Sequence, residues 1–519
     1  MAKRRTRWLV LVGAILAVGT ASCRKAGPVA ADPALSIQTA GGLVQGVSEP
    51  GIRVFRGIPY AAPPVGRWRW RPPQRAAPWE GARAADEFGA SCPQPGAPEP
   101  MTEDCLTLNI WTPADAAETS RLPVMVWIHG GGFRSGSGSD RVSHGDHLAR
   151  DGVVLVTLNY RLGALGFLAH PLLETNPVDE PRANYGLLDM VAALEWVKGN
   201  IGGFGGDPEC VTIFGESAGG MAVHLLMVVP QAKGLFHRAI GMSGYGTWPL
   251  PRVRAAVSPD APAGAPSGEE IAKAIIDRAT PEGPALETAE QLRQIPAAQL
   301  AEAVEPLHLP VVDGDVVPDE PGILFARGVQ HDVPFMTGGD SFDGAVMPWS
   351  GIPAEDFLDS WGEHGGRLRM LYADDFAVSD QLGANRLFGD ARYVMAGRYL
   401  ATQMARVSSP GYLYYFTFVP SAQGSQWPGA PHGSELGPLF GHVEDADALE
   451  VGHAMRAYWL NFARTGDPNG TGRPGWPVYD GGVDEWLVIG ETPEVQSGVI
   501  RDKLDFLEAR YLERVDASD

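Results

Sequence analysis

Residues 211–225 read VTIFGESAGGMAVHL: a short apolar run, a serine flanked by glycines, and a second apolar segment. The run 211–214 is bounded by turn residues and is typical of a strand buried on both faces. The pentapeptide GESAG at 215–219 fits the G-x-S-x-G turn, in which glycines permit a strained serine backbone between a closely packed strand and helix. The segment from Met221 onward favours that helix. The stretch therefore predicts a strand, a tight turn and a helix in succession.

Similar patterns occur on both sides of this stretch. The runs 124–128 and 153–158 also favour buried strands, and 184–200 carries apolar residues at helical spacing. Buried strands that alternate with helices predict an α/β fold with a mainly parallel sheet. Residues 249–268 are rich in Pro, Ala, Gly and Ser and predict a surface loop. We identify no domain boundary between Leu35 and Asp519, so residues 35–519 are expected to form one domain.

Composition excludes several classes of protein. The chain has 519 residues, 41 Lys and Arg against 62 Asp and Glu, and a formal net charge of −21. Such an acidic chain is a poor candidate for nucleic-acid binding, which requires a basic surface. Beyond the N-terminus no stretch approaches 18 consecutive apolar residues, so we expect no second membrane span.

The N-terminus predicts an export signal over residues 1–22. Four basic residues precede an apolar run at 8–18, and small residues lead to Cys23. The ending TASC resembles the lipobox of bacterial lipoproteins, which implies a lipidated Cys23 and anchoring to a membrane of the bacterial envelope. Residues 23–34 are rich in Ala, Pro and Gly, show no periodicity and predict a tether. Plain signal cleavage, giving a periplasmic or secreted protein, and an uncleaved membrane anchor are the alternatives.

The remaining cysteines suggest one disulfide. Cys92 and Cys105 flank 12 residues rich in Pro and acidic side chains, a loop with little to bury. A disulfide between them in an exported protein would stabilise the fold by about 3 kcal/mol. Cys210 precedes a buried strand and is interpreted as a free thiol. The number of cysteines alone does not fix this pairing.

Two glycine-containing turns suggest acyl-transfer chemistry. Ser217 is placed to attack an ester carbonyl and form an acyl-enzyme that water then hydrolyses. The segment HGGGF at 129–133 follows a predicted strand, and its glycines let backbone N–H groups approach a ligand. We expect Gly131, Gly132 and Ala218 to form an oxyanion hole, with an ordinary glycine-rich turn as the alternative. His129 is expected to be structural.

Longer motifs extend along most of the chain. They are FRGIPY (55–60), EDCLTLNI (103–110), NYRLG (159–163), FGGDP (204–208) and FARTGDP (462–468). With GESAG they resemble the type-B carboxylesterase/lipase family, the cholinesterase-like branch of the α/β-hydrolases. The resemblance implies an α/β-hydrolase fold with a central, mostly parallel sheet flanked by helices. It also implies a disulfide that ends at Cys105 and a serine esterase without metal or organic cofactor.

The resemblance also suggests the remaining residues of a triad. In this family the catalytic histidine lies in a G-x-x-H-x-x-E-L motif before an F-G pair, which GAPHGSEL at 429–436 matches, so His432 is the expected base. The family's acid lies in a D-E-G turn. Aligning GGDSFDG at 338–344 on its last glycine makes Asp343 the acid, with Asp340 as the rival. Nucleophile, acid and base then follow the α/β-hydrolase order.

The expected function is hydrolysis of a small-molecule carboxylic ester, with membrane contact through the N-terminal anchor alone. Cholinesterases of the family that the chain resembles hold a quaternary ammonium on a Trp in the loop between the first two cysteines. Residues 93–104 contain no aromatic side chain, so the resemblance does not extend to choline esters. Two alternatives remain open: a catalytically inactive binding module of the same fold at the cell surface, and a lipase for long-chain glycerides. A lipase would need an opening lid, and the loop 93–104 is short for one.

Overall fold

A computed structural model describes residues 35–96, 101–175, 180–254, 266–306, 308–421 and 426–516. The predicted signal, the tether and Cys23 lie outside the described residues. In the described part of the chain no helix is both long and apolar enough to cross a membrane. The disulfide between Cys92 and Cys105 is confirmed, with its Cα atoms 5.1 Å apart, and Cys210 is free.

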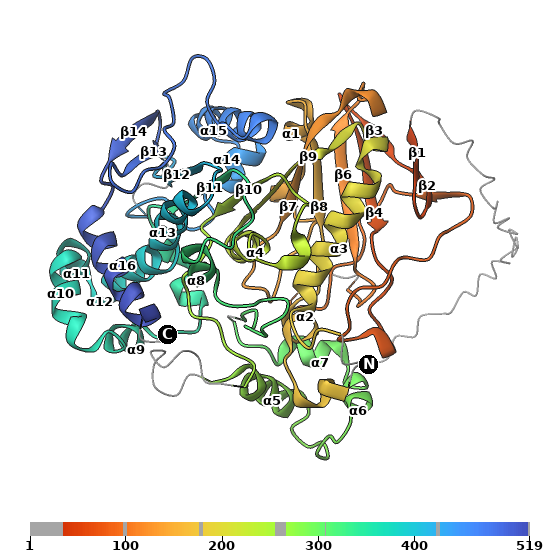
Figure 1. Cartoon of the computed structure of the whole chain (residues 1–519), viewed down its shortest axis with the longest axis horizontal. Helices are drawn as coiled ribbons and strands as arrows, with labels where there is room; N and C mark the ends of the chain where they lie inside the picture. The colour runs from red at the N-terminus through yellow and green to blue at the C-terminus, as the bar shows by residue number, and fades with distance from the viewer. Residues whose placement is uncertain are drawn as a thin grey trace, which may run out of the picture.

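A mixed sheet runs through the molecule, with helices packed along it (Figure 1). Its strand order is β14-β13-β12-β11-β10-β9-β7-β8-β6-β4-β3. The strands are β3 (Val47–Glu49), β4 (Ile52–Pro59), β6 (Thr107–Pro113), β7 (Leu122–Ile128), β8 (Val154–Leu158), β9 (Gly206–Glu216), β10 (Arg238–Met242), β11 (Phe335–Asp340), β12 (Gly411–Phe416), β13 (Glu485–Ile489) and β14 (Pro493–Ser497). A separate small sheet contains β1 (Ser36–Thr39), β2 (Gly42–Gln45) and β5 (Ala82–Ala84).

The centre of the large sheet is parallel, as predicted. Neighbouring strands from β13 to β8 run parallel, and the pairs at both ends of the sheet are antiparallel. The predicted strand at 211–214 is the central part of the longer strand β9. Parallel strands present their carboxyl ends at one edge, where ligands of α/β proteins bind.

Helices cover both faces of the sheet. They are α1 (Asp146–Arg150), α2 (Gly163–Phe167), α3 (Tyr185–Asn200), α4 (Ala218–Leu226), α5 (Gly268–Ala279), α6 (Ala289–Arg293), α7 (Ala297–Glu302), α8 (Pro321–Ala326), α9 (Ala354–Asp359), α10 (Gly365–Leu371), α11 (Ala373–Val378), α12 (Asp380–Gly389), α13 (Met395–Gln403), α14 (Leu436–Phe440), α15 (Ala446–Thr465) and α16 (Arg501–Asp516). The predicted helix at 184–200 is α3. Within the predicted loop at 249–268, residues 255–265 lie outside the described residues.

Alternate residues of β7 show how the two layers form. Val124, Val126 and Ile128 are buried with side chains of α3, α4 and α13, whereas Met125 and Trp127 are buried with side chains of α1 and α15. Successive side chains of a strand point to opposite faces, so a run that is apolar throughout requires a cover on each side. This packing holds the carboxyl ends of β7, β9 and β11 in place.

Candidate active site

Ser217 occupies a strained turn between β9 and α4. Its backbone has φ 59° and ψ −121°, a conformation that is rare for residues other than glycine. The backbone N–H of Ser217 donates to the carbonyl of Met242 at 2.9 Å. A Cβ added to Gly219 would lie 2.0 Å from the Ile128 carbonyl oxygen, and one added to Gly215 would lie 2.6 Å from it. Both glycines are therefore required by the close approach of β7.

A cavity of about 500 Å³ opens at this turn, and we refer to it as the Ser217 cavity. Its wall includes Gly131, Gly132, Ser217 and His432. The structure thus brings together residues from the ends of β7 and β9 and from a loop more than 200 positions farther along the chain. The position at the carboxyl ends of parallel strands is the usual ligand site of such sheets.

His432 lies between two carboxylates. Its Nδ1 is 2.6 Å from Asp343 Oδ1, and its Nε2 is 3.0 Å from Glu216 Oε1 without the alignment of a hydrogen bond. Burial by itself lowers the pKa of this imidazole, but the Glu216 charge and the hydrogen bond to Asp343 raise the pKa well above its ordinary value. Nε2 has no hydrogen-bond partner in the described part of the chain, Ser217 included.

The carboxylate that contacts the imidazole belongs to Asp343. Asp343 is 1% exposed, and its second oxygen accepts hydrogen bonds from the Asp340 N–H at 2.8 Å and the Ser243 hydroxyl at 3.1 Å. The side chain of Asp340 instead accepts from the Gly433 N–H at 2.8 Å. The two loops are joined by a backbone hydrogen bond from Phe342 to Ala430, 2.8 Å long. This bond holds the loops close enough for the short side chain of Asp343 to reach the imidazole.

The glycine loop after β7 presents free backbone donors. Gly131 and Gly132 have φ values of 102° and 63°, and neither they nor Ala218 donate a backbone hydrogen bond to a described residue. The side chain of His129 makes structural contacts: its Nδ1 lies 2.9 Å from the Gly130 carbonyl oxygen, and its ring stacks on that of Tyr160 with the centroids 4.3 Å apart. Two N–H groups of the loop and that of Ala218, the first residue of α4, thus have no acceptor among the described residues.

Sequence reasoning missed several polar residues around His432. Ser243 supports Asp343, and no motif marked it. Glu435 lies within the GAPHGSEL motif but was given no role. It is fully buried, and burial together with the Glu216 charge raises its pKa to about 8. Burial also raises the pKa of Asp340 well above its ordinary value. Several buried carboxyl groups thus surround one imidazole.

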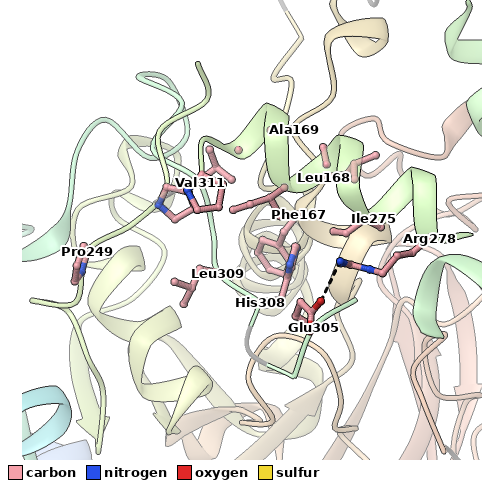
Figure 2. A pocket seen from close by; sticks show the side chains of 15 residues that line it. Phe167, Leu168, Ala169, Pro249, Ile275, Arg278, Glu305, His308, Leu309 and Val311 are labelled. Carbon is pink, nitrogen blue, oxygen red and sulfur yellow. Dashed lines mark ion pairs between the residues drawn. The ribbon is translucent and has the colours of Figure 1, made fainter. Parts of the chain in front are cut away.

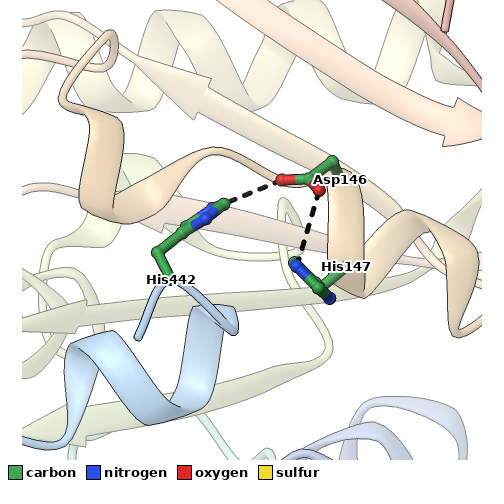
Figure 3. Close-up of side chains that lie close together, drawn as sticks. All are labelled: Asp146, His147 and His442. Carbon is green, nitrogen blue, oxygen red and sulfur yellow. Dashed lines mark ion pairs between the residues drawn. The ribbon is translucent and has the colours of Figure 1, made fainter. Parts of the chain in front are cut away.

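Two other features lie outside the Ser217 cavity. A mostly apolar cavity of about 310 Å³ is lined by Phe167 and His308, with Arg278 and Glu305 2.9 Å apart at its edge (Figure 2). The other feature is the cluster of Asp146, His147 and His442, which joins α1 to the segment after α14 (Figure 3). Its potential ligand atoms lie within 4.8 Å of one another, the one such group of His, Cys, Asp or Glu among the described residues.

The cluster in Figure 3 is already satisfied by its own contacts. Asp146 Oδ1 lies 3.3 Å from His442 Nε2, and Asp146 Oδ2 accepts from Arg150 at 2.7 Å. His442 Nε2 also lies 3.0 Å from the His144 carbonyl oxygen. None of these residues lines the Ser217 cavity. The cluster therefore links α1 to the segment after α14 and lies outside the wall of the Ser217 cavity.

Comparisons with known proteins identify the family. A family model described as "Carboxylesterase family" matches residues 33–364 and 367–507. Fumonisin B1 esterase of Sphingopyxis macrogoltabida is 35% identical over 483 residues, which cover 87% of this chain and 86% of that protein. Para-nitrobenzyl esterase of Bacillus subtilis (strain 168) is 33% identical over 479 residues, 87% of this chain and 94% of that protein.

Solved structures agree with this assignment. A structure named PNB esterase matches with a TM-score of 0.77 and 31% identity, covering 91% of this chain and 100% of its own. A Geobacillus stearothermophilus carboxylesterase matches with a TM-score of 0.78 and 31% identity, covering 90% and 99%. The resemblance inferred from the motifs and the predicted α/β-hydrolase fold are confirmed. The chain belongs to the carboxylesterase family and is a carboxylic-ester hydrolase.

Proposed function

We propose that Ser217, Asp343 and His432 form the catalytic triad of this esterase, and that Gly131, Gly132 and Ala218 supply its oxyanion hole. The observation that carries the proposal is the strained Ser217, in one cavity with a histidine whose Nδ1 lies 2.6 Å from a buried carboxylate. The free N–H groups of the glycine loop support the second part. Together these groups have the roles that serine esterase chemistry requires.

The reaction proceeds through an acyl-enzyme. Ser217 Oγ attacks the ester carbonyl carbon while His432 Nε2 accepts the hydroxyl proton, and the oxyanion is held by the three N–H groups. His432 then passes that proton to the departing alkoxide as the carbon–oxygen bond breaks. Water repeats the sequence on the acylated serine and releases the carboxylic acid. Asp343 keeps the other imidazole proton on Nδ1 and stabilises the imidazolium.

The free enzyme must rearrange slightly before this chemistry. His432 Nε2 faces Glu216 and makes no hydrogen bond in the described residues. Catalytic hydrogen bonds are often long or poorly aligned before substrate binds. We expect the imidazole to align with Ser217 in the substrate complex.

Substitution of the nucleophile tests the proposal. Ser217→Ala should abolish hydrolysis of 4-nitrophenyl esters of increasing acyl length, while its circular dichroism spectrum matches that of the wild type. Ser408→Ala, which removes an exposed hydroxyl elsewhere, should retain wild-type turnover. Hydrolysis that persists in a pure Ser217→Ala preparation would rule out the assignment.

We also propose that the enzyme is exported and anchored to a bacterial envelope membrane through a lipidated Cys23. The basic residues, apolar run and TASC ending of residues 1–23 support this. Mass spectrometry of the mature N-terminus decides the question. An acylated Cys23 at the N-terminus supports the anchor, whereas an unmodified Cys23 would refute lipidation. In that case a cleaved chain would indicate a periplasmic or secreted enzyme, and an uncleaved chain would indicate a membrane anchor.

A further inference from the structure

Arg392 is a buried cation that has no anionic partner in the described part of the chain. Its side chain is 0% exposed, and none of its guanidinium nitrogens makes a hydrogen bond to a described residue. The Tyr245 hydroxyl lies near the guanidinium but is not aligned for a hydrogen bond. Within the described ranges no carboxylate forms an ion pair with Arg392. Buried charges are ordinarily paired, so an unpaired one in a folded protein requires an explanation.

Aromatic rings hold this guanidinium without using its hydrogen-bond donors. Its central carbon lies over four rings, at centroid distances of 4.1 Å for Tyr245, 4.4 Å for Trp248, 5.5 Å for Phe388 and 5.6 Å for Tyr393. Ring faces attract the charge of a guanidinium, but its N–H groups point outward in its own plane. That planar set of donors matches the two oxygens of a carboxylate.

The local backbone places Arg392 in the wall of the Ser217 cavity. Arg392 belongs to a π-helical turn, Asp390–Val394, between α12 and α13. Such turns are rare and are frequent at functional sites. Arg392 and its neighbour Tyr393 both line the cavity that holds Ser217.

The charge of the cavity wall is opposite to that of the whole chain. The chain carries a formal charge of −21, yet the charged residues of the wall are Arg134, Arg392, Glu216 and His432. Glu216 lies beside His432, whereas Arg134 donates to a backbone carbonyl and has no acidic partner in the described residues. At physiological salt the repulsion from distant acidic residues is screened over about 8 Å. A carboxylate inside the cavity would therefore lie near two arginines that have no acidic partner among the described residues.

We infer that the Ser217 cavity is selective for esters that carry a free carboxylate in addition to the scissile ester bond, and that Arg392 binds this carboxylate. The inference rests on the proposed function, because it assigns the same cavity to the ester substrate. The rings of Tyr245 and Phe388 cover the guanidinium and line the cavity, so binding requires one of them to rotate. Arg392 is then a specificity-determining residue, and the bound carboxylate supplies its missing partner.

Pairs of esters that differ only in charge test this selectivity. On the acyl side the pair is mono-4-nitrophenyl adipate and 4-nitrophenyl 6-methylheptanoate, in which an isopropyl group replaces the carboxylate. On the alcohol side the pair is the acetate ester of 4-hydroxybutanoate and 4-methylpentyl acetate. In one of the two pairs the wild type should show the higher kcat/KM for the charged ester. The pair that shows it tells which half of the substrate meets Arg392.

Variants of Arg392 test whether this residue causes the preference for the charged ester. In Arg392→Met the ratio of charged to neutral kcat/KM should fall at least tenfold, and Arg392→Lys, which keeps the charge, should restore part of it. The matched control is Arg369→Gln, which removes an exposed arginine over Phe376 outside the cavity and should keep the wild-type ratio. A ratio unchanged in Arg392→Met, or a wild-type preference for the neutral ester in both pairs, would overturn the inference.

A measurement on the wild type covers the case in which Arg392→Met does not fold. Adipate should inhibit hydrolysis of 4-nitrophenyl butyrate competitively, with an inhibition constant at least tenfold below that of the neutral adipamide, and equal constants would refute the inference. Failure of the selectivity inference can be distinguished from failure of the proposed triad. If neutral esters are hydrolysed through Ser217 but selectivity ignores Arg392, the triad remains and the inference fails. If Ser217→Ala stays active, the triad fails.

Discussion

The contact between Glu216 and His432 predicts the acid side of the pH–rate profile. His432 must be neutral to accept a proton from Ser217, so kcat/KM should fall as the pH drops through the pKa of His432. That pKa is raised by the Glu216 charge. Glu216→Gln removes the charge and keeps the shape, so it should lower the pKa of His432. The acid limb of the profile should therefore move to lower pH.

The size of the effect follows from the distance. Two unit charges 3.0 Å apart attract by about 1.4 kcal/mol at the dielectric constant of water and by about 5.5 kcal/mol at an effective value of 20. Both side chains are largely buried, with 10% and 7% exposed, so the smaller figure is a lower bound. The imidazolium of Glu216→Gln should thus lose at least about 1.4 kcal/mol of stabilisation, enough to move the limb clearly.

The assay is kcat/KM for a neutral 4-nitrophenyl ester from pH 5 to pH 9, corrected for spontaneous hydrolysis. Glu435→Gln is the matched buried control. The pKa of Glu435 is raised to about 8, so below that pH this group is mostly protonated and its amide removes little charge. The limb should move far less in Glu435→Gln than in Glu216→Gln. An unmoved limb in Glu216→Gln, or a limb moved to higher pH, would refute the electrostatic reasoning.

Two further substitutions test the acid of the triad and the disulfide. Asp343→Asn should lower kcat on the order of 10³- to 10⁴-fold, because the imidazole loses its anionic partner. Asp340→Asn keeps an acceptor for the Gly433 N–H and should lower kcat far less. Equal losses of kcat in steady-state kinetics would contradict the assignment of Asp343 as the acid. Replacing Cys92 and Cys105 by Ser opens a loop of sequence separation 13 and should lower the free energy of unfolding by about 3 kcal/mol in urea titrations. An unchanged titration midpoint would show that the loop needs no cross-link.

The parts of the fold that were predictable are those set by local sequence. β7, β8 and the core of β9 are short apolar runs because both faces of the sheet are covered, and such runs are visible without any knowledge of distant contacts. The turn at Ser217 was equally predictable, because the close approach of β7 requires glycine at positions 215 and 219 and those glycines form a recognisable motif. Local patterns therefore predicted the central strands and the turn at Ser217.

Residues that act through distant contacts were harder to predict. Asp340 and Asp343 are three positions apart, so the motif favoured Asp343 but left Asp340 as a rival. The packing of their loop against Ala430 shows that Asp343 is the one that contacts His432. Ser243 and Arg392 belong to no motif, because their importance comes from what they face after folding. Sequence patterns reveal groups fixed by backbone geometry, whereas supporting and specificity residues require the assembled cavity.

The arrangement around His432 serves two opposing requirements. In the proposed mechanism, a carboxylate near each imidazole nitrogen stabilises the imidazolium that forms in the transition state, which favours proton transfer from Ser217. The same charges raise the pKa of His432 in the free enzyme and so withdraw the base at low pH. Burial limits this effect, because it lowers the pKa of His432 directly and, together with the Glu216 charge, raises the pKa of the nearby Glu435 to about 8. The contacts of His432 with Glu216 and Asp343 therefore narrow the pH range of activity and, in the proposed mechanism, also lower the barrier to proton transfer.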